Sequence, residues 1–118
     1  MAGKLSTHVL DTTQGCPAAG MKIELWYLDE DKRTLCRTTR TAPDGRTDKP
    51  LLSGVEMKPG MYELVFFVGD YFAGRSINLP AIPFLSQVPV RFGMADPSAS
   101  YHIPLLCSPW AYSTYRGS

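Results

Sequence analysis

The distribution of glycine and proline constrains the fold of this 118-residue chain more than any other feature. Ten glycines and ten prolines are scattered along its whole length. No segment keeps apolar residues at positions i, i+3, i+4 and i+7 for several helical turns, so long helices are disfavoured. We therefore expect an all-β domain in which short strands are joined by tight turns.

Three segments alternate in the period of a β-strand, at residues 21–27, 62–68 and 88–94. The second is apolar on both faces, so it needs cover from a second sheet or from another subunit. Turn signals at residues 13–17, 43–45, 58–60 and 95–98 separate the strands. We predict one domain over residues 1–118, a two-sheet β-sandwich of seven or eight strands. One short helix is expected at residues 69–74.

The charge balance excludes several classes of partner. Lysine and arginine number 12 against 11 acidic residues, a net charge of +1, which provides no field for nucleic acid or an anionic membrane. No apolar run approaches the roughly 20 residues of a membrane-spanning helix, and the first twenty residues hold no signal-like apolar core. We expect a soluble protein that is not secreted and whose partner is a small molecule or another subunit.

The cysteines indicate a reducing compartment. Cys16, Cys36 and Cys107 are odd in number and form no Cys-x-x-Cys pair, which does not fit a disulfide framework. The last three residues are not a peroxisomal Ser-Lys-Leu signal. We therefore expect the protein in the cytoplasm.

His8 is the first candidate for chemistry. In the segment STHVLD at residues 6–11, His8 and Leu10 share one face of a strand while Thr7 and Val9 take the other. A lone histidine beside apolar neighbours is more often a hydrogen-bonded structural residue than a catalyst. The segment by itself leaves both interpretations open.

Arg46 follows an Asp-Gly turn, where most arginines are simply solvated. The functional alternative is capture of an anion or of a carbonyl-rich ring. A planar guanidinium presents paired donors to such a ring and stabilises charge that develops on oxygen during attack at a carbonyl.

His102 is the second histidine, and in a regular strand it shares a face with Pro104 and Leu106. Pro104 predicts a sheet edge or a break in pairing, which would place His102 near solvent or ligand. The ordinary imidazole pKa of roughly 6.5 lets either histidine take a proton from water and return it to a leaving nitrogen. Two histidines and one arginine are sufficient for amide hydrolysis.

Other arrangements have weaker support. Ser6, His8 and Asp11 are triad residue types, but they lie on one short segment without a nucleophile elbow, so chance is the better explanation. The histidines and cysteines have no zinc-like spacing, so no metal is expected. Cys107 is better explained as a small buried residue than as a nucleophile. No glycine-rich phosphate loop is present, so no cofactor is expected.

The chain end, YHIPLLCSPWAYSTYRGS at residues 101–118, is unlike an ordinary frayed terminus. It carries His102, three tyrosines, a tryptophan and two prolines, so it must pack against something. Together with four other segments it resembles the transthyretin-like 5-hydroxyisourate hydrolases, whose chains end in YRGS. The other four segments are residues 6–11, residues 15–20 (GCPAAG), residues 44–47 (DGRT) and residues 91–97 (RFGMADP).

The resemblance implies a transthyretin-like sandwich, a homotetramer, and active sites in a central channel at the dimer–dimer interface. It implies hydrolysis of 5-hydroxyisourate, the product of urate oxidation, to 2-oxo-4-hydroxy-4-carboxy-5-ureidoimidazoline without metal or cofactor. By the family pattern the catalytic residues are His8, Arg46, His102 and Ser118, and the substrate-binding residues are Arg46, Tyr115, Arg116 and Gly117. Arg46 would bind the ring and stabilise an oxyanion, either histidine would activate water, and the tail would close the site.

The chain departs from the family pattern at Cys107, where leucine is usual, and at Ala111, where glycine is common. Neither position is assigned to catalysis. The main alternative is a transthyretin-type carrier that binds a hydrophobic small molecule in the channel and performs no chemistry. A carrier needs apolar walls and neither the histidines, the arginine nor the YRGS tail. A purely structural sandwich would leave the composition of the tail unexplained.

Overall fold

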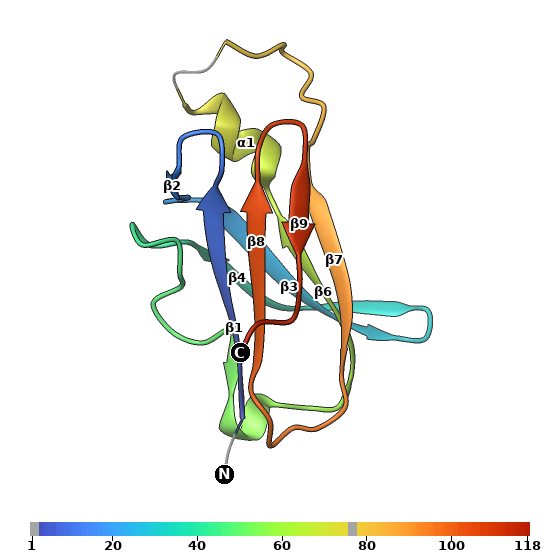
Figure 1. The fold of residues 1–118 in the computed structure, drawn as a ribbon. Coiled ribbons are helices and arrows are strands. Elements are labelled where there is room, and N and C mark those ends of the chain that lie inside the picture. Colours follow the sequence, from blue (N-terminus) through green and yellow to red (C-terminus); the bar gives the residue numbers. More distant parts are fainter. Residues whose placement is uncertain (1–2, 76–77) are drawn as a thin grey trace.

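A computed structural model describes residues 3–75 and 78–118 as two β-sheets that pack against each other, with a short helix at one end (Figure 1). One sheet has the order β2 (Cys16–Pro17), β1 (Lys4–Asp11), β8 (Tyr101–Cys107) and β9 (Tyr112–Thr114), and β5 (Leu52–Ser53) also pairs with β1. The other has the order β4 (Lys32–Arg40), β3 (Lys22–Asp29), β6 (Gly60–Phe66) and β7 (Val88–Met94). The β1–β8 pair is parallel, and all the other pairs are antiparallel.

The predicted all-β sandwich is confirmed, with differences in detail. The described residues form nine strands instead of seven or eight, because β2 and β5 are two-residue strands. The predicted helix is α1 (Val68–Ala73), and a 3-10 turn, η1 (Gly54–Glu56), was not expected. The predicted strand at residues 62–68 was wrong at its end, because β6 stops at Phe66 and Val68 begins the helix.

The core lies between the two sheets and follows the alternation in the sequence. Leu5 and Val9 of β1 are fully buried, as are Ile23 and Leu25 of β3. Leu105 of β8, in the same sheet as β1, is equally buried. Burial of one large aliphatic side chain stabilises a fold by about 1.5–3 kcal/mol. This apolar layer therefore contributes much of the free energy that holds the two sheets together.

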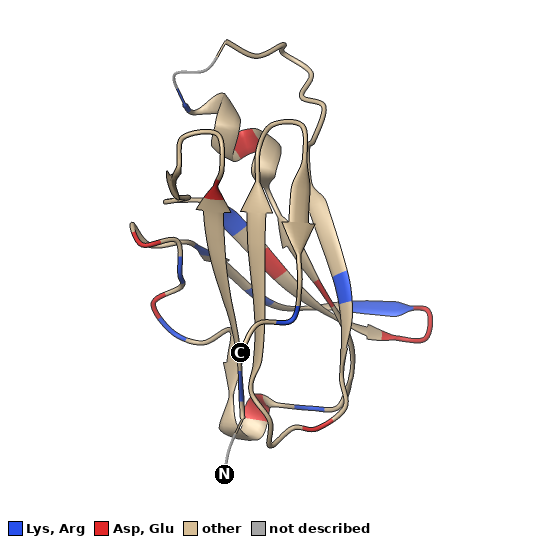
Figure 2. Ribbon diagram, viewed as in Figure 1, with Lys and Arg blue, Asp and Glu red and all other residues tan. Residues whose placement is uncertain are grey.

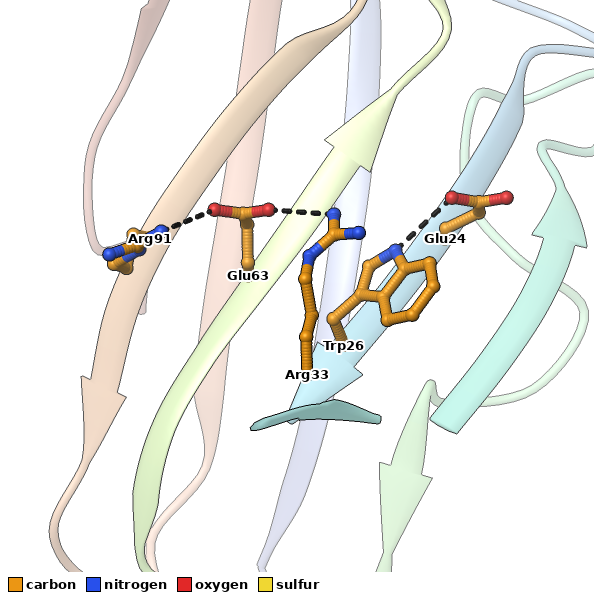
Figure 3. Close-up of polar contacts among 5 residues, drawn as sticks. All are labelled: Glu24, Trp26, Arg33, Glu63 and Arg91. Atoms are coloured by element: carbon orange, nitrogen blue, oxygen red, sulfur yellow. Dashed lines mark hydrogen bonds and ion pairs between the residues drawn. The ribbon is translucent and has the colours of Figure 1, made fainter. Parts of the chain in front are cut away.

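The outer face of β6 is covered by side chains of its own sheet. Glu63 is only 7% exposed, and its carboxylate accepts hydrogen bonds from Arg33 at 2.9 Å and Arg91 at 3.2 Å (Figure 3). The Arg33 guanidinium stacks on the Trp26 ring, whose nitrogen donates to Glu24 at 3.1 Å. The sequence predicts that both faces of β6 are buried. In the structure the second sheet packs on one face, and at Glu63 the long side chains of Arg33 and Arg91 cover the other.

Pro104 lies in β8, which has neighbours on both sides, so the expectation of an edge strand was wrong. The predicted break in pairing is present, because β9 pairs only with residues 105–107 of β8. The carbonyls of His102 and Pro104 accept hydrogen bonds from Gly117 and Thr114, so these residues face the C-terminal segment. Proline has no N–H to donate, and at Pro104 this group would point toward the C-terminal segment, where β8 is not paired with β9.

Asp11 fixes the end of β1. Its carboxylate, buried at 1% exposure, accepts hydrogen bonds from the Thr13 and Gln14 backbones, from the Gln14 side chain and from the Tyr71 hydroxyl of α1. Arg75 stacks on the Tyr71 ring. One carboxylate therefore holds the β1–β2 turn and ties the helix to the sheet.

Charged residues of both signs are interspersed along the sheets and turns (Figure 2), as the near-neutral composition predicts. All three cysteines are free thiols, and burial raises the pKa of Cys107 to about 12, with the nearby Asp11 carboxylate adding to the shift. Among residues 3–75 and 78–118, no helix has the length and apolar character needed to cross a membrane.

Candidate active site

The candidate site lies on the outer face of the sheet that contains β1 and β8. Alternation along β1 turns Leu5, Thr7 and Val9 into the core and leaves Ser6 and His8 half-buried on the outside. His102 of the neighbouring β8 is half-buried on the same face, because parallel register sets it opposite Ser6. The two histidines, 94 positions apart in the sequence, thus lie on adjacent strands.

The turn at residues 43–45 brings Arg46 to His8. Arg46 forms an isolated antiparallel bridge with His8, and the Val9 amide donates to the Gly45 carbonyl at 2.9 Å. Gly45 has φ +83°, and a Cβ there would collide with the Val9 backbone, so the close approach needs glycine. The Asp44 carboxylate accepts from the Arg46 amide at 2.9 Å, which fixes the turn.

His8 is held by the same turn. Its Nε2 donates a hydrogen bond to the Asp44 carbonyl at 2.8 Å. A carbonyl only accepts, so the neutral ring carries its proton on Nε2 and its lone pair on Nδ1. The turn therefore sets both the orientation and the tautomer of His8.

His102 has different partners. Its Nδ1 lies 2.9 Å from the Ser6 hydroxyl, and its carbonyl accepts from the Gly117 amide at 2.7 Å. Burial lowers the pKa of His102 below 6.5, and the positive charge of Arg46 and the proximity of the His8 ring lower it further. That coupling places the three predicted residues in one electrostatic environment and keeps His102 neutral near pH 7.

The C-terminal segment is paired to β8 instead of frayed, and the chain end returns across β8 toward β1 (Figure 1). Gly117 lies against the His102 ring, where a Cβ would be 2.6 Å from Cδ2. Arg116 takes another direction, with its guanidinium 4.4 Å from the centre of the Tyr101 ring and donating to the Ser100 carbonyl at 3.4 Å.

The other tail residues predicted to act at the site are open to solvent in the single chain. Tyr115 is 61% exposed, and Ser118 is also exposed. The structure therefore brings His8, Arg46, His102 and Gly117 together, and leaves Tyr115, Arg116 and Ser118 outside that cluster. The roles of these three side chains stay predictions.

Only a small hollow lies beside Arg46 and Ser6 on one chain, and neither histidine lines it. A cavity of about 130 Å³ adjoins Ser6 and Arg46 and is also lined by Lys4, Thr7 and residues 47–50. Small-molecule sites usually enclose about 300–1,000 Å³, so this hollow is too small to surround a ligand. A larger apolar cavity, about 380 Å³, lies between α1, residues 79–85 and the β8–β9 turn, and shares no residue with the histidine face.

Sequence reasoning missed the contact of Ser6. Ser6 and His8 share the outer face of β1 while Asp11 is buried against Tyr71, so the three do not form a triad, as the sequence indicated. Ser6 instead contacts the other histidine. Only the register of β1 against β8 reveals this contact, because the two strands are far apart in the chain.

No three His, Cys, Asp or Glu side chains are arranged to hold a metal ion in the described parts of the chain. What the site does contain is a set of proton acceptors and one fixed cation on a polar surface. Such a set suits proton transfer to and from water and stabilisation of a developing oxyanion.

Comparisons with known proteins identify relatives of this chain. Residues 5–117 match the HIUase/Transthyretin family. 5-Hydroxyisourate hydrolase 2 of Rhizobium meliloti (strain 1021) is 55% identical over 117 residues, which cover 99% of this chain and 98% of the relative. A crystal structure of (S)-allantoin synthase matches with TM-score 0.93 and 46% identity over 99% of this chain, which corresponds to 44% of that longer chain. Transthyretin from Sparus aurata shares the fold, with TM-score 0.85 and 23% identity over 97% of this chain and 96% of that one.

Proposed function

This chain belongs to the HIUase/transthyretin family, and from that membership and its site we propose that it is a 5-hydroxyisourate hydrolase of urate degradation. The reaction opens the cyclic amide of 5-hydroxyisourate to give 2-oxo-4-hydroxy-4-carboxy-5-ureidoimidazoline. The observation that carries the proposal is the convergence of His8, Arg46 and His102 on one outer sheet face.

Arg46 is the residue assigned to the substrate carbonyl. Its guanidinium is permanently charged and offers several donors in one plane, which suits both a carbonyl-rich ring and the oxyanion formed when water attacks. The bridge to His8 and the Asp44 turn hold its backbone in place. A preorganised donor of this kind contributes a rate factor of about 10²–10³.

His102 is the histidine that we assign as general base. Its lowered pKa keeps the ring neutral, and with Nδ1 against Ser6 its Nε2 is left to take a proton from water. Hydroxide adds to the ring carbonyl carbon, the C–N bond of the tetrahedral intermediate breaks, and the Nε2 proton passes to the leaving nitrogen. His8, with its lone pair on Nδ1, is assigned to orient the substrate or the water.

We propose a homotetramer with the active sites at the dimer–dimer interface. The shallow hollow of about 130 Å³ and the exposure of Tyr115 support a site that needs a second subunit to enclose the substrate. In that arrangement Tyr115, Arg116, Gly117 and Ser118 would complete the binding surface. Size-exclusion chromatography with light scattering tests the assembly, and a monomer that is fully active would contradict it.

The carrier alternative has less support. A carrier of hydrophobic ligands needs apolar walls, whereas the face around His8 and His102 carries an arginine, a serine and two imidazoles. We also propose that the protein resides in the cytoplasm, which the free thiols of the exposed Cys16 and Cys36 support. Fractionation of cells that express the protein tests this location.

The decisive experiment follows the ultraviolet decay of 5-hydroxyisourate generated in place by urate oxidase. The protein should accelerate the decay, and Arg46→Ala should lower kcat by about 10²–10³-fold. Arg40→Ala is the matched control, because Arg40 is an exposed arginine of the other sheet whose guanidinium donates to the Gly20 carbonyl at 3.0 Å. Decay at the spontaneous rate with the correctly folded protein would overturn the proposed function.

A second pair of variants tests the histidines. His8→Ala and His102→Ala should each lower turnover by about 10²–10⁴-fold while circular dichroism stays unchanged, since both side chains lie on the outer face. A fully active double variant would refute the assigned chemistry.

A further inference from the structure

The Ser6 hydroxyl is the one side-chain group that forms a hydrogen bond with the His102 ring within the described part of the chain. Its oxygen lies 2.9 Å from Nδ1, and the two residues are direct partners in the parallel β1–β8 ladder. Both side chains are half-buried on the outer face. Rigid backbone on both strands therefore sets this contact, because β1 and β8 pair over seven consecutive residues.

The other edge of the ring is also confined. A Cβ at Gly117 would lie 2.6 Å from Cδ2, so the tail backbone passes directly against that edge. Rotating the ring by half a turn would place Cδ2 against the serine oxygen and would lose the hydrogen bond. With Nδ1 toward Ser6 and Cδ2 toward Gly117, the distal Nε2 points away from the sheet.

We propose that Ser6 is a positioning residue for catalysis: its hydroxyl accepts the Nδ1 proton of His102 and so keeps the ring's lone pair on Nε2. This inference rests on the proposed hydrolase activity and assigns a residue that acts through His102. When Nε2 takes a proton from water, the imidazolium has N–H donors on both nitrogens, and the serine oxygen still accepts from Nδ1. The hydrogen bond therefore persists while the proton is taken up at Nε2 and passed to the leaving nitrogen.

A hydroxyl has an advantage over a carboxylate at this position. An aspartate beside Nδ1 would favour the charged imidazolium and raise the pKa of the ring, which would oppose the effects of burial and of Arg46. Serine orients the ring without adding charge. His102 can then stay neutral, as a general base requires, while its tautomer is still fixed.

The test compares Ser6→Ala with Ser6→Thr, which keeps a hydroxyl and suits a strand. Ser6→Ala should lower kcat by about 10–100-fold with a smaller change in KM, and Ser6→Thr should restore most of the loss. Ser100→Ala is the matched control, because Ser100 lies two residues before His102 and its hydroxyl makes no hydrogen bond within residues 3–75 and 78–118. Ser6→Ala with wild-type kcat would overturn the proposal.

A spectroscopic measurement separates positioning from a merely structural role. The chain has two histidines, so its imidazole ¹⁵N spectrum contains two rings. In the wild-type protein at neutral pH, His102 should carry its proton on Nδ1, and in Ser6→Ala it should shift toward the Nε2–H tautomer. His8 should be the Nε2–H ring in both proteins, because its Nε2 donates to the Asp44 carbonyl. A His102 ring that carries its proton on Nε2 in the wild type would overturn the proposal. If the wild type does not accelerate decay, the hydrolase proposal fails, and the spectrum still decides whether Ser6 sets the tautomer.

Discussion

Replacing Gly117 with alanine tests how closely the tail constrains His102. Gly117 has no left-handed φ, so an alanine fits its backbone and any effect comes from contact alone. A Cβ built there lies 2.6 Å from Cδ2, 3.3 Å from Cγ and 3.4 Å from Cβ of His102. The added methyl group therefore meets the ring edge-on.

The size of the effect follows from that overlap. Carbon atoms pack at about 3.5 Å or more, so the new methyl group is roughly 0.9 Å too close to Cδ2. Either the ring moves by about that distance or the tail withdraws and loses its 2.7 Å hydrogen bond to the His102 carbonyl. A displacement of about 1 Å in a reacting group costs about 100-fold in rate, so kcat should fall by about that factor.

The assay is the ultraviolet decay of 5-hydroxyisourate, with Gly74→Ala as the control. Gly74 directly follows α1 and has φ −85°, and a Cβ there would lie 3.6 Å from the Tyr71 carbonyl oxygen, which is ordinary contact. This variant should keep wild-type kcat, and neither substitution should change the thermal unfolding midpoint by more than a few degrees. Wild-type kcat in Gly117→Ala would refute the argument that the tail backbone positions the ring.

Three further predictions concern stability, pH and thiol reactivity. Asp11→Ala removes a buried acceptor of four hydrogen bonds, among them the acceptor of the Tyr71 hydroxyl, so urea unfolding should show a loss of about 2–4 kcal/mol. Asp31→Ala, on an exposed hairpin, should change stability by less than about 0.5 kcal/mol, and equal losses would contradict this account. Because burial and nearby positive groups lower the pKa of His102, kcat/KM should rise with pH along a limb centred below 6.5 and level off above it. A midpoint above 6.5 would exclude that ring as the base. Cys107 should resist alkylation at pH 8 until the protein unfolds, since burial raises its pKa to about 12, while the two exposed cysteines react; three fast thiols in the native protein would contradict this.

Local patterns were sufficient to predict the sandwich. The buried alternation of Ile23 and Leu25, the apolar run that became β6, and the strand at residues 88–94 all follow from side chains that point to opposite faces at successive positions. The turns and the short helix also follow from local cues. β4 was missed because it is an exposed edge strand without an apolar face, and its turn uses Glu30 at φ +51° instead of glycine.

The candidate residues were found from sequence by the resemblance of their motifs, since His8, Arg46 and His102 each have an ordinary structural explanation when taken alone. Their arrangement depended on tertiary structure. The parallel pairing of β1 with β8 joins segments nearly a hundred residues apart, and its register decides that Ser6, not Asp11, contacts a histidine. A one-residue shift would turn His102 into the core. Sequence therefore determined which residues can do chemistry, and strand register decided which of them meet, because register is set by packing of the whole core.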